Sequence, residues 1–135
     1  MIYCDVSQEV GKKIKDCFFQ DIVRHFFKEF DIKDAEISIV IVNKNEIKKF
    51  NKNYRKQNRV TDVLSFIYNK KPLEGEILIC YEKALQQAKE NKIDLNQEIK
   101  LLLVHSLLHL IGYDHKNIKE ANKMKKMENK ILSVI

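Results

Sequence analysis

The sequence predicts an α+β fold, a single domain over residues 1–135 in which a small mixed sheet of four strands packs with about five helices. Four short segments carry the alternating or continuous apolar residues of β-strands, and five longer segments carry the three-and-four spacing of amphipathic helices. The 135 residues include only three glycines and one proline, which leaves little room for linkers or a second domain. A chain of this length is expected to build one hydrophobic core.

The first half of the chain is expected to alternate strands with helices. Apolar residues at every second position predict a short strand over residues 2–6. Apolar residues then recur at helical spacing over residues 8–30, and Ser7 stands where the N-cap of that helix is expected. Residues 35–42 are almost continuously apolar and β-branched, which predicts a buried strand. An Asn-x-x-Glu sequence typical of a capping box then opens a short helix, predicted over residues 43–53.

The second half is expected to form two further strands and three further helices. In chain order these elements are predicted over residues 63–68, 77–80, 81–90, 95–111 and 118–132. A polar loop around Pro72, residues 69–74, is expected to join the two strands. Asp94 is the expected N-cap of the central helix 95–111, and Gly112 allows the left-handed conformation that often ends a helix.

Composition excludes a membrane-spanning chain and a disulfide-stabilised one. No apolar run approaches the roughly 18 residues of a transmembrane helix, and the N-terminus lacks the apolar region of a signal peptide. Cys4, Cys17 and Cys80 lie far apart without a C-x-x-C pair, so three reduced thiols are expected. The sequence therefore predicts a cytoplasmic protein with no membrane partner. Its formal net charge of +6 by itself indicates a nucleic-acid partner only weakly.

Three of the four histidines fall within eleven residues at the end of the predicted central helix. His105 and His109 are four residues apart, so both imidazoles leave the same helix face one turn apart. Gly112 lets the chain turn back, so that His115 can supply a third ligand. A single histidine on an apolar helix face is more often a core residue, but three clustered imidazoles are hard to keep there without a metal. Three histidines with an open fourth position are typical of a catalytic zinc site.

The spacing of the histidines and of the intervening glycine matches the metzincin proteases, H-E-x-x-H-x-x-G-x-x-H. In those proteases the glutamate takes a proton from the zinc-bound water, and Ser106 stands at its position here. Because a serine cannot act as that base at pH 7, the protease interpretation is weakened and the metal site is not. A metal-dependent peptidase or amide hydrolase of metzincin-like site geometry is kept as an alternative hypothesis.

Three stretches of the chain resemble the YbeY family of bacterial endoribonucleases. Residues 105–115, HSLLHLIGYDH, resemble the signature H-G-x-L-H-L-x-G-Y-D-H. Residues 51–66, NKNYRKQNRVTDVLSF, resemble N-x-x-Y-R-x-x-D-x-x-T-D-V-L-S-F, and residues 75–77, GEI, resemble G-D-I. The chain departs from these motifs at Asn58, Val60, Glu76 and Ser106. Neither the three histidines nor Arg55 is among these departures.

The resemblance implies a zinc-dependent, single-strand-specific endoribonuclease that matures the 3′ end of 16S rRNA and takes part in ribosome quality control. It implies one Zn²⁺ ion, with Ni²⁺ as the alternative, and RNA and the small ribosomal subunit as partners. Arg55 is the arginine that the resemblance places near the metal as a catalytic residue, and its guanidinium suits the charge on a phosphodiester oxygen. A non-catalytic ribosome-binding zinc protein is a third hypothesis. The nucleophile, water or a ribose 2′-OH, and the oligomeric state stay open.

Several residues near the motifs have two interpretations each. Asp114 either holds an imidazole in one tautomer or is a turn residue. The side chain of Ser106 either crowds the metal site or points to solvent. Thr61 and Ser65 either shape the cleft or simply occupy a strand. The lysines of the last helix either approach RNA phosphates or form a solvated face.

Overall fold

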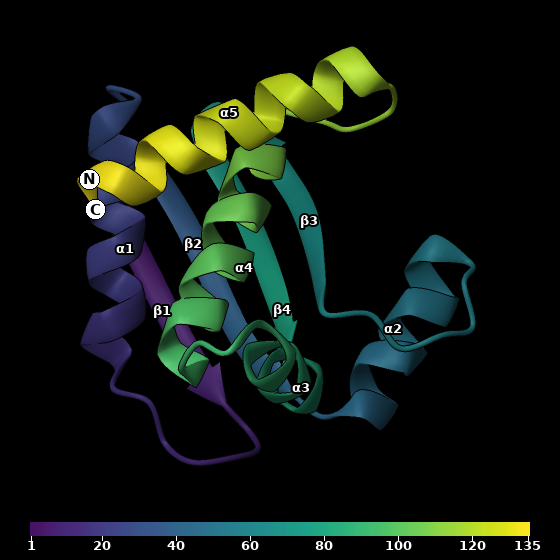
Figure 1. Cartoon of the computed structure of the whole chain (residues 1–135). Coiled ribbons are helices and arrows are strands. Elements are labelled where there is room, and N and C mark those ends of the chain that lie inside the picture. The colour runs from purple at the N-terminus through teal and green to yellow at the C-terminus, as the bar shows by residue number, and fades with distance from the viewer.

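The nine helices and strands alternate in the first half of the chain, and the last three elements are helices. The computed structural model describes residues 1–135 (Figure 1). The elements are β1 (Ile2–Gln8), α1 (Asp16–Glu29), β2 (Ala35–Val42), α2 (Lys44–Arg55), β3 (Val63–Lys70), β4 (Leu73–Cys80), α3 (Tyr81–Asn91), α4 (Leu95–Leu110) and α5 (Ile118–Val134). This confirms the predicted α+β class, with four strands and five helices in the expected order. No helix is long and apolar enough to cross a membrane.

The four strands form one mixed sheet in the order β1–β2–β4–β3. β1 and β4 both run parallel to β2, whereas β3 pairs with β4 in the antiparallel direction. The central strands β2 and β4 are therefore flanked on both sides, and β3 is an edge strand. β2 and β4 are mostly buried, as expected for strands at the centre of a sheet.

Helices cover the two faces of the sheet unequally. α1 and α4 pack on one face, where they bury the main core of 23 residues with the sheet (Figure 1). α2 packs against β3 and β4 over a second, smaller cluster, which consists of Val42, Ile47, Leu64, Leu78 and Cys80. α5 lies across the C-terminal end of α4 (Figure 1). This arrangement leaves the end of α4 between α5 and the edge of the sheet.

The predicted start of the first helix was wrong. β1 continues to Gln8, and α1 begins only at Asp16 with Lys15 as its N-cap residue, so Ser7 lies in the strand. The pairing of β1 with β2 along its whole length decides this, because each added pair satisfies backbone groups of both strands. The Gln8 side chain then holds the following turn by accepting a hydrogen bond from the backbone N–H of Ile14, at 2.9 Å.

The polar loop expected over residues 69–74 is mostly strand. β3 extends to Lys70 and β4 begins at Leu73, so a two-residue turn joins them. The polar residues of this segment pair across the hairpin, with Asn69 opposite Glu74. The Asn69 side chain also donates to the carbonyl of Pro72, at 2.8 Å. Backbone pairing between neighbouring strands thus outweighs the polar composition that favoured a loop.

The helices that precede and carry the candidate site begin at the predicted caps. The Asn43 side chain accepts a hydrogen bond from the backbone N–H of Glu46, at 2.9 Å, and α2 ends two residues later than predicted, at Arg55. At α4, the side chains of Asp94 and Gln97 each accept a hydrogen bond from the other residue's backbone N–H, which completes a capping box. This box fixes the start of the helix that supplies two of the three histidines.

Candidate metal centre

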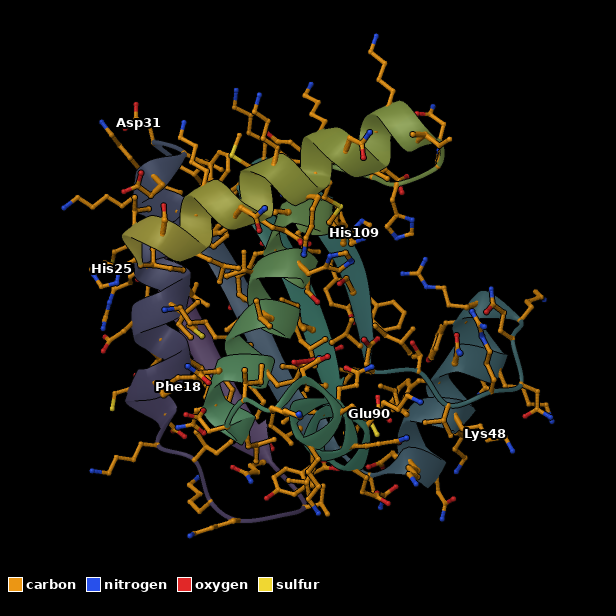
Figure 2. The ribbon with its side chains drawn as sticks, viewed as in Figure 1. Phe18, His25, Asp31, Lys48, Glu90 and His109 are labelled. Carbon is orange, nitrogen blue, oxygen red and sulfur yellow. The ribbon has the colours of Figure 1, made fainter.

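α4 presents two imidazoles side by side at its C-terminal end. His105 and His109 lie one turn apart, and their Nε2 atoms are 3.2 Å from each other. Both side chains are half-buried, because the opposite side of α4 packs into the core. In Figure 2 His109 lies on the side of α4 that faces β3 and α2. The helix thus points both imidazoles away from the core and toward the edge of the sheet.

A tight turn after α4 brings the third histidine to the same place. Gly112 adopts a φ of +113°, a conformation that glycine tolerates because it has no Cβ. The backbone N–H of Tyr113 donates to the carbonyl of Leu108, at 3.0 Å, and closes the helix end. The His115 ring then lies 5.0 Å from the His109 ring between centroids. The expectation that glycine lets His115 return to the helix is confirmed.

The three histidines have the geometry and the chemistry of a metal-ligand set. One ring nitrogen from each of His105, His109 and His115 lies within 4.8 Å of the other two. A tetrahedral zinc ion with Zn–N bonds of about 2.0–2.1 Å separates two ligand nitrogens by about 3.3 Å. The 3.2 Å between the first two nitrogens fits this value, and the exposed His115 is the ligand that can shift inward. The group can therefore hold a metal ion.

Burial favours the neutral, metal-binding form of His109. Burial lowers the pKa of His109, and the neighbouring His105 and His115 lower it further, whereas Asp114 acts in the opposite direction. An imidazole binds a metal only when its nitrogen is deprotonated. The lowered pKa therefore keeps this ligand ready to bind.

Glu128 on α5 holds the second nitrogen of His105. Its carboxylate is almost fully buried, and its Oε1 accepts a hydrogen bond from the Nδ1 of His105. Because Nδ1 carries the proton of this bond, Nε2 is left as the nitrogen that could bind a metal, and it faces His109. Burial alone raises the pKa of Glu128, but the hydrogen bond and charge of His105, together with Lys125, lower it below its ordinary value.

Glu128 is a site residue that the sequence motifs do not contain. The signal for it is the spacing of Met124, Glu128 and Ile131, which places all three on one face of α5. All three are buried, although Glu128 is charged and only the other two are apolar. A glutamate on the buried face of an amphipathic helix requires a partner, because carboxylates are almost never buried alone.

Asp114 is a turn residue and not the partner of an imidazole. Its Oδ1 accepts a hydrogen bond from the backbone N–H of His115, at 2.7 Å, and its other oxygen lies 3.8 Å from the Lys116 ammonium. That backbone hydrogen bond is the main cause of a lowered pKa of Asp114. The role of fixing an imidazole tautomer belongs to Glu128.

Ser106 is fully buried, so the expectation that its side chain points to solvent was wrong. Its exposed fraction is 0%, and its Oγ has no hydrogen-bond partner. It follows His105 directly in the helix, so its side chain leaves α4 about 100° around the helix axis from that of His105. The position that holds the base in the metzincin motif is thus occupied here by a buried hydroxyl.

Arg55 comes from a different element and is attached to the edge strand. It is the last residue of α2, and its Nη2 donates a hydrogen bond to the backbone carbonyl of Ser65 on β3. Its guanidinium also lies over the ring of Phe66, 5.3 Å from the centroid. The structure therefore brings the three histidines together, while it fixes Arg55 through contacts with β3.

The remaining residues of the 51–66 motif hold the loop between α2 and β3. Asn51 is buried, and its side chain donates to the carbonyl of Arg59, at 3.0 Å. The Asp62 side chain accepts from the backbone N–H of Val63, at 2.8 Å, and the Thr61 hydroxyl donates to it at 3.3 Å. Thr61 thus lies in the loop just before β3 and not in the strand. These contacts fix the segment that follows Arg55.

His25, Met124 and the lysines of α5 lie outside the metal centre. His25 lies exposed on α1, far from His109 (Figure 2). Met124 is buried in the main core. The lysines of α5 are exposed, and Lys125 contacts Glu128 at 3.6 Å.

The fold and the site define the class of the protein. A mixed sheet is covered by a helix whose C-terminal end carries two imidazoles, and the turn after the helix adds a third, with no fourth protein ligand in the group. Sites with three protein ligands keep a position open for water or substrate, which is the pattern of metal-dependent hydrolases and not of structural zinc sites. The three histidines of this chain have the pattern of this class.

Comparison with known families identifies the group within this class. The model of the family described as Endoribonuclease YbeY matches residues 3–135. The chain belongs to this family. The resemblance seen in the three sequence motifs is thereby confirmed.

Individual relatives match over nearly the whole chain. The Endoribonuclease YbeY of Caldicellulosiruptor bescii is 40% identical over 95% of this chain and 88% of its own length. That of Pelagibacter ubique is 36% identical over 100% of this chain and 97% of its own. Among solved structures, the solution structure of TM1509 from Thermotoga maritima matches with a TM-score of 0.63 and 25% identity. This match covers 96% of the chain described here and 89% of the Thermotoga chain.

Proposed function

We propose that the chain, as one hydrolase domain over residues 1–135, is a zinc-dependent endoribonuclease that cuts single-stranded RNA. The observation that carries the proposal is the convergence of three imidazole nitrogens within 4.8 Å of one another, in a chain of the YbeY family. His105, His109 and His115 would hold one Zn²⁺ ion, with Ni²⁺ as the alternative. With an open fourth position, such an ion supplies Lewis-acid chemistry to a phosphodiester.

Arg55 is the proposed catalytic residue outside the metal ligands. A guanidinium has five N–H donors in a fixed plane, and the contact with Ser65 uses only its Nη2. The remaining donors are free to bind an oxygen of the scissile phosphodiester and to stabilise the charge that develops there. The bond to β3 holds the guanidinium in place, so little conformational freedom is lost when RNA binds.

The proposed substrate is ribosomal RNA in its single-stranded regions, above all the 3′ end of 16S rRNA on the small subunit in the cytoplasm. Residues 44–59 support a polyanionic substrate, because they contain seven Lys or Arg residues and one Glu, for a formal charge of +6. This segment includes Arg55. We extend the proposal to ribosome quality control, which acts on the same class of RNA.

The alternative of a peptidase or amide hydrolase loses its main support. Peptide hydrolysis at a site of this spacing uses a carboxylate base beside the first ligand, and Ser106 is buried in the core at that position. A peptide substrate would also pair with an edge strand. On β3 the carbonyl of Ser65 is taken by Arg55. A casein assay of the zinc-loaded protein is expected to show no turnover.

Two variants test the proposed function. His109→Ala is expected to lose the bound metal, measured by elemental analysis after dialysis. Arg55→Ala is expected to keep the metal and to cut a single-stranded RNA about 10²- to 10³-fold more slowly, as when one donor to transition-state charge is removed. Arg24→Ala, which removes an exposed arginine of α1, is the matched control and should cut normally.

Each of the competing hypotheses predicts a different result. Retention of a full equivalent of metal by His109→Ala would contradict the ligand assignment. Turnover of casein would favour the peptidase. Correction of an rRNA-processing defect equally by wild type and by Arg55→Ala would favour a non-catalytic ribosome-binding zinc protein.

A further inference from the structure

Three aromatic rings and one guanidinium form a stacked platform on α2 and β3. The Phe50 and Tyr54 rings, one helical turn apart, lie with centroids 5.8 Å apart and planes 18° apart. The Tyr54 ring meets Phe66 edge-on, at 5.7 Å and 72°. The guanidinium of Arg55 lies over the same Phe66 ring, with its Cζ 5.3 Å from the ring centroid. We call these four residues the aromatic platform.

Tyr54 is the open member of the aromatic platform. Phe50 and Phe66 are half-buried and pack against the small core cluster under α2. Tyr54 rests on both of them and is nevertheless 64% exposed. A tyrosine held on one face by a stacked neighbour presents its other face in a fixed orientation, which costs a binding partner little conformational entropy.

The charge around the aromatic platform selects the kind of ligand. The surrounding residues 44–59 carry a formal charge of +6, and the lysines and arginines of this segment are exposed. A fixed aromatic face within a basic surface is the combination that binds single-stranded nucleic acid, because the phosphates meet the charge while a base stacks on the ring. In a duplex the bases already stack on one another and cannot reach such a ring.

The position of Arg55 relates the aromatic platform to the proposed reaction. Tyr54 and Arg55 are consecutive in the chain, and both contact the same Phe66 ring. We propose that Tyr54 stacks an unpaired base of single-stranded RNA next to the phosphate that Arg55 binds. This base-stacking site rests on the proposed function and deepens it, because it explains selectivity for single strands by a contact that a paired base cannot make.

Binding of oligonucleotides to the zinc-loaded full chain tests the base-stacking site. Tyr54→Ala is expected to weaken binding of a short single-stranded RNA about 5- to 100-fold, whereas Tyr54→Phe keeps it, because only the ring is required. Binding of the same RNA as a duplex should not change, and neither should the metal content. Tyr3→Ala, which removes a 58% exposed tyrosine from the opposite edge strand β1, is the matched control.

An abasic oligonucleotide separates stacking from charge. If Tyr54 binds a base, an RNA strand without bases at its central positions should bind wild type and Tyr54→Ala equally. Equal binding of intact single-stranded RNA by wild type and Tyr54→Ala would overturn the inference. An equal loss of duplex binding would also overturn it, because that result indicates a change in contacts with the RNA backbone. An apolar peptide that competes with RNA for Tyr54 would overturn it as well.

A fluorescent variant makes the test independent of whether Tyr54→Ala folds. The chain has no tryptophan, so Tyr54→Trp introduces a single tryptophan at the base-stacking site, whose emission can be excited apart from that of the tyrosines. Single-stranded RNA is expected to quench its emission strongly, and the abasic strand or the duplex only weakly. Equal quenching by all three ligands, or none, would overturn the inference.

Failure of this inference can be told apart from failure of the proposed function. Stacking without any RNA cleavage would leave the base-stacking site in place and contradict the endoribonuclease. Cleavage of single-stranded RNA by Tyr54→Ala at the wild-type KM would contradict the base-stacking site alone. A rise in KM with little change in kcat is the expected signature, because the stacked base contributes binding energy before and during the reaction.

Discussion

At the scale of single residues, Glu128 and His105 meet where α5 crosses α4. The carboxylate occupies Nδ1, so Nε2 is turned toward His109. A free imidazole exchanges its proton between both nitrogens and rotates about two bonds, and each wrong arrangement lowers the population that can bind a metal. Glu128 removes those alternatives, although it comes from a helix 23 residues further along the chain.

Replacing Glu128 is therefore expected to weaken metal binding without removing a ligand. Glu128→Ala should lower the affinity for Zn²⁺ about 10- to 100-fold, the usual effect of losing a partner that orients a metal-binding histidine. Glu128→Gln keeps an acceptor but not the charge, so its affinity for Zn²⁺ should lie between those of Glu128→Ala and wild type. Competition with a chromophoric chelator measures both affinities.

An exposed glutamate of the same helix provides the control for Glu128. Glu120→Ala should bind Zn²⁺ as tightly as wild type, because Glu120 lies in the first turn of α5 and is exposed. If Glu128→Ala binds Zn²⁺ with unchanged affinity and is folded by circular dichroism, the carboxylate does not orient His105.

At the scale of the elements, α4 serves the core and the metal centre at once. From Leu102 onward its residues are buried against α1, α3, α5 and the sheet, whereas His105 and His109 are half-buried. On the buried side, the hydroxyl of Ser106 and one carboxylate oxygen of Glu98 lie buried without a hydrogen-bond partner. A buried hydroxyl without a partner costs about 1–3 kcal/mol relative to one that is hydrogen-bonded.

Ser106→Ala is expected to stabilise the protein. The change removes the unpaired hydroxyl and favours the helix, so the free energy of unfolding should rise by about 1 kcal/mol. For a chain of this size the melting temperature should rise by roughly 3–5 °C, measured by differential scanning calorimetry of the metal-free protein.

Ser133 offers a matched control within another helix. It is exposed on α5, and its hydroxyl donates to the carbonyl of Lys130, at 2.7 Å. Ser133→Ala should change the melting temperature little. A fall in stability on Ser106→Ala would show that this hydroxyl is hydrogen-bonded in solution.

The elements also show where sequence patterns are reliable. The end of α4 was predicted within a residue, because the last apolar residues, Gly112 and the capping residues are all local features. The start of α1 was predicted eight residues too early, since residues 8–15 carry apolar residues at helical spacing but join a strand and a turn. Their conformation depends on pairing with β2, which lies about thirty residues away in the chain. A local sequence pattern does not contain this contribution.

At the scale of the whole molecule, the positive charge is concentrated in two elements. Residues 44–59 carry a formal charge of +6, and α5 carries +3 with five lysines and two glutamates. The rest of the chain is therefore net negative, at −3. An RNA strand is thus attracted more strongly to the region of α2 and α5 than to the rest of the chain taken together, a difference that the net charge of +6 alone does not show.

The salt dependence of RNA binding is expected to show which of these charges contact RNA. Each phosphate contact contributes about −0.7 to the slope of log affinity against log salt for a single strand. Lys48→Gln with Lys52→Gln on α2 should therefore make the slope shallower by about 1.4. Lys28→Gln with Lys33→Gln, an exposed pair near the end of α1, should leave it unchanged. Equal slopes for both pairs would contradict α2 as the RNA-binding element.

The sequence by itself determined the class of fold, the family and the three candidate ligands. The fold class, the family and the ligands all rest on local information. For the ligands, a four-residue separation on a helix places His105 and His109 together, and one glycine brings back His115. Only the tertiary structure decided that Glu128 faces His105, that Ser106 is buried and that Arg55 is fixed on β3 beside Phe66. These contacts join different elements, and they follow from how sheet and helices pack, which the spacing of residues along one element does not encode.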